Sequence, residues 1–188
     1  MKYLNGLLKR IYQDITIKSL VLITLGFVLF TAGVLPLIAN ITTNVIGVSE
    51  SPDTSFNFNV TSLYEILESY GRDGRNFYIL MRWTFDVVWP LVYTGFIISL
   101  IAYFTKVNTI NYHLKRYIFP LLAILFDYLE NTFATIVMVI YPIEIDFISY
   151  LLFISSIIKW VTLSIAFLIA IYYMVFTIIN KCRTKRKI

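Results

Sequence analysis

The chain has 188 residues, of which 59% are hydrophobic and only 14% are charged, and its mean hydropathy is +0.76. Soluble domains carry about 25% charged residues, so this composition excludes an ordinary soluble protein and indicates a membrane protein. One Cys and one His leave no internal disulfide and no zinc site, and we expect neither a metal nor a cofactor. The net charge of +5 comes largely from basic residues beside hydrophobic segments, which favours contact with membrane lipids and not with nucleic acid.

Four hydrophobic segments reach the roughly 20 residues that a helix needs to cross the bilayer. They cover residues 20–41, 77–104, 117–141 and 148–179. The first is longer than the roughly 7–15 residues of a signal-peptide core and no A-x-A-like site follows it, so we predict a retained helix. The sequence therefore predicts one all-α domain over 1–188, a four-helix transmembrane bundle that runs up-down-up-down.

The predicted loop over 42–76 contains a short helical pattern. Ser62 and Glu65 have the spacing of a capping box, and Gly71 follows as a stop signal. Four apolar residues recur at helical spacing between them, namely Leu63, Ile66, Leu67 and Tyr70. We expect a short amphipathic helix in this outer loop. It either lies on the bilayer surface or over the bundle mouth, or it only packs its apolar face.

Basic and acidic residues are distributed unequally among the segments outside the predicted spans. Twelve basic residues and one acid, Asp14, lie before the first span, between the second and third, and in the tail over 180–188. The other two loops hold seven acids and only two basic residues, Arg72 and Arg75. The positive-inside rule then predicts a multi-pass protein of the cell inner or plasma membrane with both termini in the cytoplasm.

Ionisable side chains also occur inside the predicted spans, where a central charge costs about 2.5–3.5 kcal/mol. They are Arg82, Asp86, Asp127, Glu130 and Lys159. At that cost we expect them to face one another inside the bundle. Helical spacing places Asp127, Glu130 and Asn131 within one 100° arc, lets Lys159 meet Glu130, and lets Arg82 pair with Asp86 four residues on.

Two further expectations concern the environment of these charges. Pro90 cannot donate a hydrogen bond to the carbonyl of Asp86, so that oxygen should lie free beside the carboxylate and favour a cation or a water-filled pocket. Counting helical rise places Asp86 near the outer interface and Glu130 close to the midplane. Three acids face two bases, so one carboxyl should be protonated, shared or matched by a bound cation.

The predicted site comprises Arg75, Arg82, Asp86, Tyr93, Asp127, Glu130, Asn131 and Lys159. Our leading hypothesis is a small-molecule or cation-binding membrane module or accessory subunit. Its ligand would be a small amphiphile, a proton or a cation, and its partners membrane lipids or another membrane subunit. One alternative is an intramembrane enzyme that uses paired carboxylates as acid and base on a lipid or isoprenoid. The other is a purely structural ion-pair network.

Geometry separates these hypotheses. A lipid enzyme requires an apolar tunnel that opens sideways to the bilayer beside the acids, whereas a transport module requires polar access from both faces. A Mg²⁺ ion would require Asp86, Asp127, Glu130 and Asn131 to converge. A nucleophilic Ser–Lys dyad would require Ser155 or Ser156 to reach Lys159.

Several short patterns fall in order between Tyr70 and Ala166. They are Tyr70-Gly71-x-x-Gly74-Arg75-x-x-Tyr78, Asp86-x-x-x-Pro90-x-x-Tyr93, Asp127-x-x-Glu130-Asn131 after Pro120, and Lys159 in the fourth span. In these patterns the chain resembles an uncharacterised family of small bacterial four-helix membrane proteins. The resemblance implies that the patterned residues share one site. The chain also resembles, more loosely, the emopamil-binding-type sterol isomerases, but it lacks their intramembrane histidine.

Overall fold

The computed structural model describes residues 2–47, 51–52 and 59–185. Positions 48–50 and 53–58 of the predicted outer loop and positions 186–188 of the predicted tail lie outside the described residues. The described residues form helices and contain no strand, and four of these helical stretches are long and apolar enough to cross a membrane. The predicted all-α, four-helix bundle is therefore confirmed.

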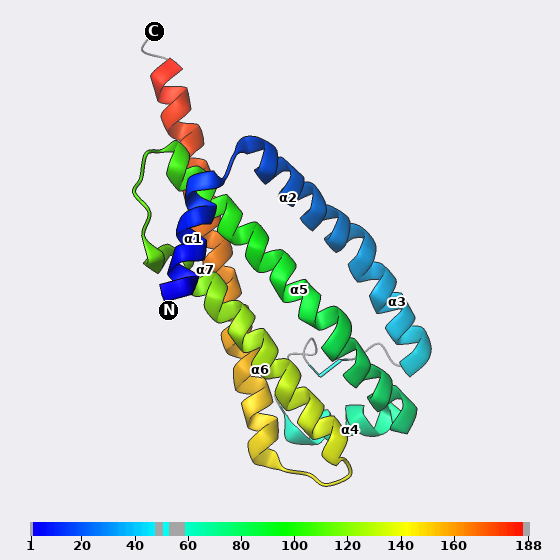
Figure 1. The fold of residues 1–188 in the computed structure, drawn as a ribbon. Helices are drawn as coiled ribbons and strands as arrows, with labels where there is room; N and C mark the ends of the chain where they lie inside the picture. The colour runs from blue at the N-terminus through cyan, green and yellow to red at the C-terminus, as the bar shows by residue number, and fades with distance from the viewer. Residues whose placement is uncertain (1, 48–50, 53–58, 186–188) are drawn as a thin grey trace.

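The four crossings run alternately up and down, as Figure 1 shows. The first is made of α2 (Ile17–Leu29), a π-helical turn (Phe30–Val34) and α3 (Leu35–Ile46). The others are α5 (Gly71–Val107), α6 (Ile118–Ile140) and α7 (Asp146–Lys185). A 3₁₀ turn over Leu114–Tyr117 precedes α6. Below, the end of the bundle with the α6–α7 turn is called the α4 end, and the end with the α1–α2 turn the α1 end.

The wide turn in the first crossing has a local cause. Pro36 has no N–H and stands at the start of α3, where it interrupts the regular helical hydrogen bonds. The N–H of Leu35 donates to the carbonyl of Phe30, five residues back, and the turn widens to a π-helix there. The first crossing therefore stays continuous over Ile17–Ile46, longer at both ends than the predicted 20–41.

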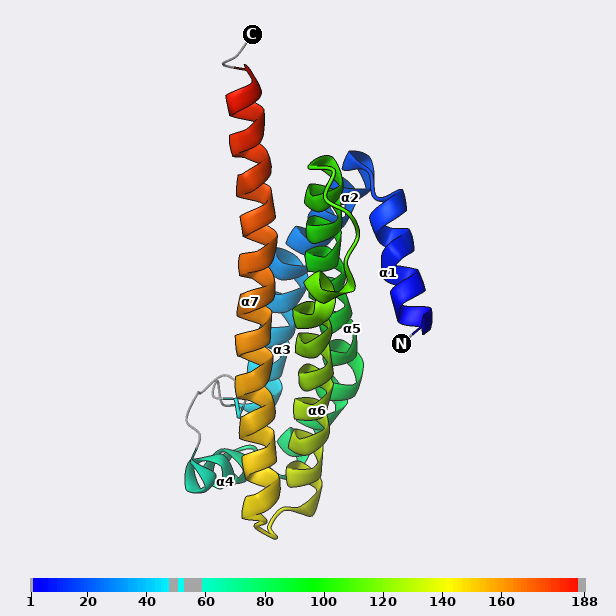
Figure 2. The same ribbon diagram turned by 90° about the vertical axis from the view of Figure 1, so that its left-hand side faces the viewer.

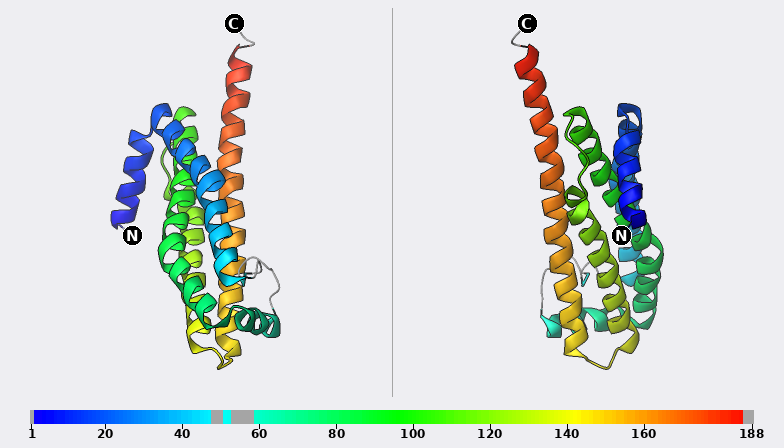
Figure 3. Two further views of the ribbon diagram at one scale, coloured as in Figure 1. Left: turned by 90° about the vertical axis from the view of Figure 1, so that its right-hand side faces the viewer. Right: turned by 60° about the vertical axis from the view of Figure 1, so that its left-hand side comes forward.

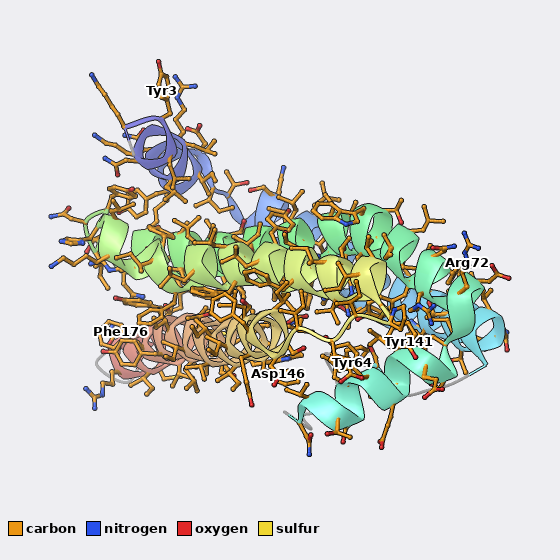
Figure 4. The ribbon with its side chains drawn as sticks, turned by 90° about the horizontal axis from the view of Figure 1, so that it is seen from below. Tyr3, Tyr64, Arg72, Tyr141, Asp146 and Phe176 are labelled. Atoms are coloured by element: carbon orange, nitrogen blue, oxygen red, sulfur yellow. The ribbon has the colours of Figure 1, made fainter. Side chains whose placement is uncertain are left out.

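The short helix of the outer loop is α4 (Val60–Ser69), which lies across the α4 end of the bundle (Figure 2). The predicted cap at Ser62 is wrong, because Asn59 is extended and its side chain accepts the N–H of Thr61 at 2.9 Å. The apolar side chains predicted for one face are all buried, and α4 contacts both α5 and α7. Seen from below in Figure 4, Tyr64 projects from α4 toward Tyr141 and Asp146.

A sharp corner joins α4 directly to α5. Gly71 adopts φ +60°, a left-handed conformation that favours glycine, and α5 begins there instead of at the predicted residue 77. One turn later, a Cβ at Gly74 would lie 3.3 Å from the Cβ of Tyr70. Gly71 therefore supplies the backbone conformation of the corner, and Gly74 allows its close packing.

The amino-terminal helix α1 (Lys2–Asp14) is an element that our sequence analysis did not predict. It runs back along the bundle from the α1–α2 turn, beside α5 (Figure 3). Its Leu8 is 1% exposed, and Tyr12 donates a hydrogen bond to the Ile110 carbonyl at 2.8 Å. The Lys106 ammonium donates to the Ile15 carbonyl just beyond α1 at 3.0 Å.

Two apolar clusters fill the interior on either side of a charged layer. The cluster toward the α4 end includes Tyr78 of α5, Val137 of α6 and Leu152 of α7. The cluster toward the α1 end includes Ile97, Ala123 and Ala166 from the same three helices, together with Leu8 of α1. Along each helix, the charged residues fall between these two groups.

Candidate functional site: a buried charged layer and a neighbouring groove

Arg82 of α5 connects the acids of the charged layer. Its Nη1 lies 3.1 Å from Oδ2 of Asp86, one turn further along the same helix. The same nitrogen donates to Oδ1 of Asn131 on α6 at 3.1 Å and lies 3.7 Å from Oε1 of Glu130. Arg82 also donates to the hydroxyl of Tyr78. The predicted pair of Arg82 and Asp86 is therefore confirmed as one part of a larger network.

Glu130 is the point at which three helices meet. Its Oε1 accepts a hydrogen bond at 2.8 Å from Nζ of Lys159 on α7, as the sequence predicted, while Arg82 approaches from α5. Glu130 is 0% exposed and Asn131 is 1% exposed. One turn toward the α1 end, the hydroxyl of Tyr93 donates to Oδ2 of Asp127 at 2.9 Å. Two basic groups and a tyrosine thus contact the carboxylates of α6.

The carbonyl of Asp86, which Pro90 leaves without its helical donor, has a side-chain partner. Asn131 Nδ2 donates to it at 3.1 Å, so this oxygen does not require the cation or water that the sequence suggested. Because Arg82 and Asn131 join Asp86 to Glu130, the two acids lie at one level. The expected difference in depth between Asp86 and Glu130 is therefore wrong, because contacts between α5 and α6 set these two residues side by side.

Arg75 lies apart from the charged layer, at the α4 end. Its Nη1 donates to the Leu67 carbonyl of α4 at 2.9 Å, and its guanidinium lies 4.3 Å from the centre of the Tyr141 ring. The structure therefore brings seven of the eight predicted site residues together and places Arg75 at the corner between α4 and α5.

The charged layer is closed by protein on most sides. Its most accessible carboxylate belongs to Asp86, whose side chain is 22% exposed. Within the described part of the chain, no three acidic, histidine or cysteine side chains converge as metal ligands, so the Mg²⁺ arrangement considered above is not formed. Ser156 is buried and its hydroxyl has no hydrogen-bond partner among the residues that the structure describes, so Ser156 does not form the considered dyad with Lys159.

An apolar groove of about 580 Å³ lies between α1–α2 and α5, toward the α1 end. Gly26 of α2 and Gly95 of α5 line it, and a Cβ added at either glycine would meet nothing within 4 Å. Phe27 and Phe30 form part of its wall, and polar groups are few: Asp14, Ser19 and Ser99. Our sequence analysis did not predict this groove, because apolar and small residues in a membrane helix carry no chemical signature.

The groove and the charged layer lie on different faces of α5. At 100° per residue, Val92, Gly95, Phe96 and Ser99 point about 110° away from Arg82, Asp86 and Tyr93. A row of contacting aromatic rings connects the groove with the charged layer. Trp89 stacks on Phe27 and Phe30, with centroids 5.9 and 5.5 Å apart, and meets the edge of Tyr93 at 5.6 Å.

Fold and composition together define a multi-pass helical membrane protein whose central helices share a buried charged layer. No protein-family model, no curated protein and no solved structure matches the chain.

Proposed function

We propose that this chain is a membrane module that binds a neutral, single-chain amphiphile in the groove between α2 and α5. The observation that carries the proposal is the groove itself, an apolar space of about 580 Å³ beside two glycines that leave it open. Small-molecule sites typically enclose about 300–1,000 Å³ and combine apolar walls with few polar groups. The acyl chain would lie along Gly26, Phe27 and Phe30, with its head toward Ser19 and Ser99.

In this proposal the charged layer is a clamp that fixes α5, α6 and α7 relative to one another. Glu130 is contacted from α5 by Arg82 and from α7 by Lys159, so one carboxylate connects three helices. Its complete burial supports a structural role. Lipid tails give apolar helices no strong reason to associate, and buried polar contacts supply specificity of pairing instead.

The position of the groove favours binding over the alternatives. The alternative enzyme would use the paired carboxylates of the charged layer as acid and base, so the reacting atom of the lipid would have to lie beside them. The groove lies on another face of α5, and none of those carboxylates lines it. Ion transport requires a polar route, yet apolar clusters border the layer toward both ends among the described residues. Binding of a chain-like molecule needs neither condition.

We further propose that both termini face the cytoplasm and that the protein resides in the cell inner or plasma membrane. The support is the excess of Lys and Arg in the segments before the first crossing, between α5 and α6, and after the fourth crossing. Of these, α1, the α5–α6 connection and the end of α7 gather at the α1 end.

Photolabelling tests the binding site directly. The protein in detergent micelles would be irradiated with monopalmitoylglycerol that carries a diazirine in its acyl chain, and the labelled peptides would be mapped by mass spectrometry. We expect label within residues 11–30 and 92–99, reduced by excess unlabelled monopalmitoylglycerol. Gly26→Leu should abolish this label because the new side chain fills the groove.

The matched control is Gly33→Leu, seven residues along the same crossing, where the glycine also has open space but lies outside the groove lining. It should leave the labelling unchanged. Label spread evenly over all lipid-facing segments, insensitive to Gly26→Leu and to competitor, would contradict the proposal.

A further inference from the structure

A second cavity lies at the α1 end, between the 3₁₀ turn that precedes α6 and the distal part of α7. Its volume is about 430 Å³, and it is lined by two basic residues, two tyrosines and an apolar floor: Lys115, Arg116, Tyr172, Tyr173, Ile165, Leu168 and Ile169. It is separate from both the groove and the charged layer, whose residues do not line it.

The guanidinium in this cavity is held in a fixed orientation. Nε of Arg116 donates to the hydroxyl of Tyr173 at 3.0 Å, and Nη1 donates to the Asn111 carbonyl. A guanidinium has five N–H donors, so three remain after these two bonds. The neighbouring Lys115 is exposed, and its ammonium makes no hydrogen bond to any residue that the structure describes. Two cationic residues that keep unused donors among the described residues therefore line one small space.

The depth of the cavity matches the headgroup region of a bilayer. Asp146 and Tyr173 are 27 residues apart on α7, which is about 40 Å of helix. A bilayer measures about 40–45 Å with its headgroups, so these two residues would lie at its opposite surfaces. The tyrosine pair then occupies the interfacial aromatic belt. The apolar floor lies one to two turns deeper, where acyl chains begin.

We infer that this cavity is a binding site for an anionic phospholipid of the leaflet at the α1 end. The lipid phosphate would accept hydrogen bonds from Arg116 and form an ion pair with Lys115. The acyl chains of the lipid would cover Ile165, Leu168 and Ile169. Basic pockets between transmembrane helices are typical anionic-lipid sites, and planar guanidinium groups bind phosphate with two parallel bonds. The inference goes beyond the proposed function and does not depend on it.

Thermal unfolding in neutral detergent, with phosphatidylglycerol or phosphatidylcholine added, tests this site. We expect phosphatidylglycerol to raise the unfolding midpoint of the wild type and phosphatidylcholine to have a much smaller effect. The double variant Lys115→Gln/Arg116→Gln should need at least about ten-fold more phosphatidylglycerol for the same rise, which corresponds to the loss of one strong contact. Tyr173→Phe, which only releases the guanidinium, should need a few-fold more.

The matched control is Lys181→Gln/Arg183→Gln on α7, which removes the same amount of charge at the same end of the bundle but outside the cavity. It should respond to phosphatidylglycerol as the wild type does. If both double variants lost the stabilisation by phosphatidylglycerol equally, the lipid would be attracted by overall charge and the inference would be overturned. The inference would also be overturned if neither double variant lost this stabilisation. Inorganic phosphate forms a further arm. If it alone reproduced the stabilisation, the cavity would be a free-phosphate site and the lipid assignment would be wrong.

Discussion

Glu130 is the residue on which the charged layer depends most. It is fully buried and lies between Lys159 at 2.8 Å and Arg82 at 3.7 Å. Removing one partner of a buried ion pair is far more destabilising than replacing both, because the remaining charge stays desolvated. A carboxylate shared by two cations should follow this rule strongly.

We therefore predict that Glu130→Gln lowers the free energy of unfolding by about 3–5 kcal/mol. Lys159→Met should have a smaller effect, because Glu130 keeps its contact with Arg82. Glu130→Gln combined with Lys159→Met should cost less than the sum of the two single changes. Thermal unfolding of the four proteins measures this coupling. Strict additivity would show that the two side chains do not act as a pair.

At the scale of one element, α6 replaces the backbone hydrogen bond that Pro90 removes from α5. Asn131 donates to the Asp86 carbonyl, the oxygen that a residue with an N–H at position 90 would otherwise bond. We predict that Asn131→Leu is destabilising by about 1–3 kcal/mol, the cost of an unsatisfied buried polar group. In a Pro90→Ala background the same change should be milder, since the backbone N–H of the introduced alanine can bond the carbonyl. The unfolding midpoints of the four proteins in this double-mutant cycle test the prediction. An equal effect of Asn131→Leu with and without Pro90→Ala would contradict it.

Docking of α1 is a second property of an element. Leu8 is 1% exposed and packs into the cluster at the α1 end, whereas the adjacent Leu7 is 57% exposed. We predict that Leu8→Glu releases α1 and raises amide hydrogen exchange over residues 2–14 at least about ten-fold, because burying a lone carboxylate is costly. The matched change Leu7→Glu should leave this exchange near the wild-type rate. Equal amide exchange over residues 2–14 in the two variants would show that the docking of α1 does not depend on the burial of Leu8.

The sequence predicted the four crossings and the meeting of Arg82, Asp86, Glu130 and Lys159, because both follow from the high cost of exposing charge or backbone to lipid. It missed features that depend on geometry between elements. The groove forms because two glycines on different helices face one space. The hydrogen bond from Asn131 to the Asp86 carbonyl joins two helices, and no local sequence pattern predicts it. Helix α1 was not predicted although Leu8, Ile11 and Ile15 have helical spacing, because this pattern is short and is interrupted by charged residues.

For the whole molecule, the orientation in the membrane is a separate prediction. Cys182 is an exposed thiol near the end of α7, which makes it a natural reporter of sidedness. We predict that a membrane-impermeant maleimide modifies it only after the membrane is opened, since the basic α1 end should face the cytoplasm. In a Cys182→Ser background, Thr61→Cys on α4 should be modified in intact cells. The reverse pattern would invert the topology.

The family resemblance over Tyr70–Ala166 implies one shared site, and that role stays a prediction. In our account the same residues have separate tasks: Gly71 and Arg75 at the α4–α5 corner, and the charges in the clamp. We thus propose that the molecule as a whole combines a structural clamp, made by the charged layer, with a lateral binding groove.

Thermal unfolding of the wild type, Glu130→Gln and Gly95→Leu, each with and without monopalmitoylglycerol, separates the two roles. We predict that Gly95→Leu unfolds near the wild-type midpoint but loses the stabilisation by ligand, because its side chain occupies the groove. Glu130→Gln should unfold roughly 10 °C lower yet keep the ligand-induced shift. A shift that survives in Gly95→Leu and disappears in Glu130→Gln would place the ligand at the charged layer and contradict the account.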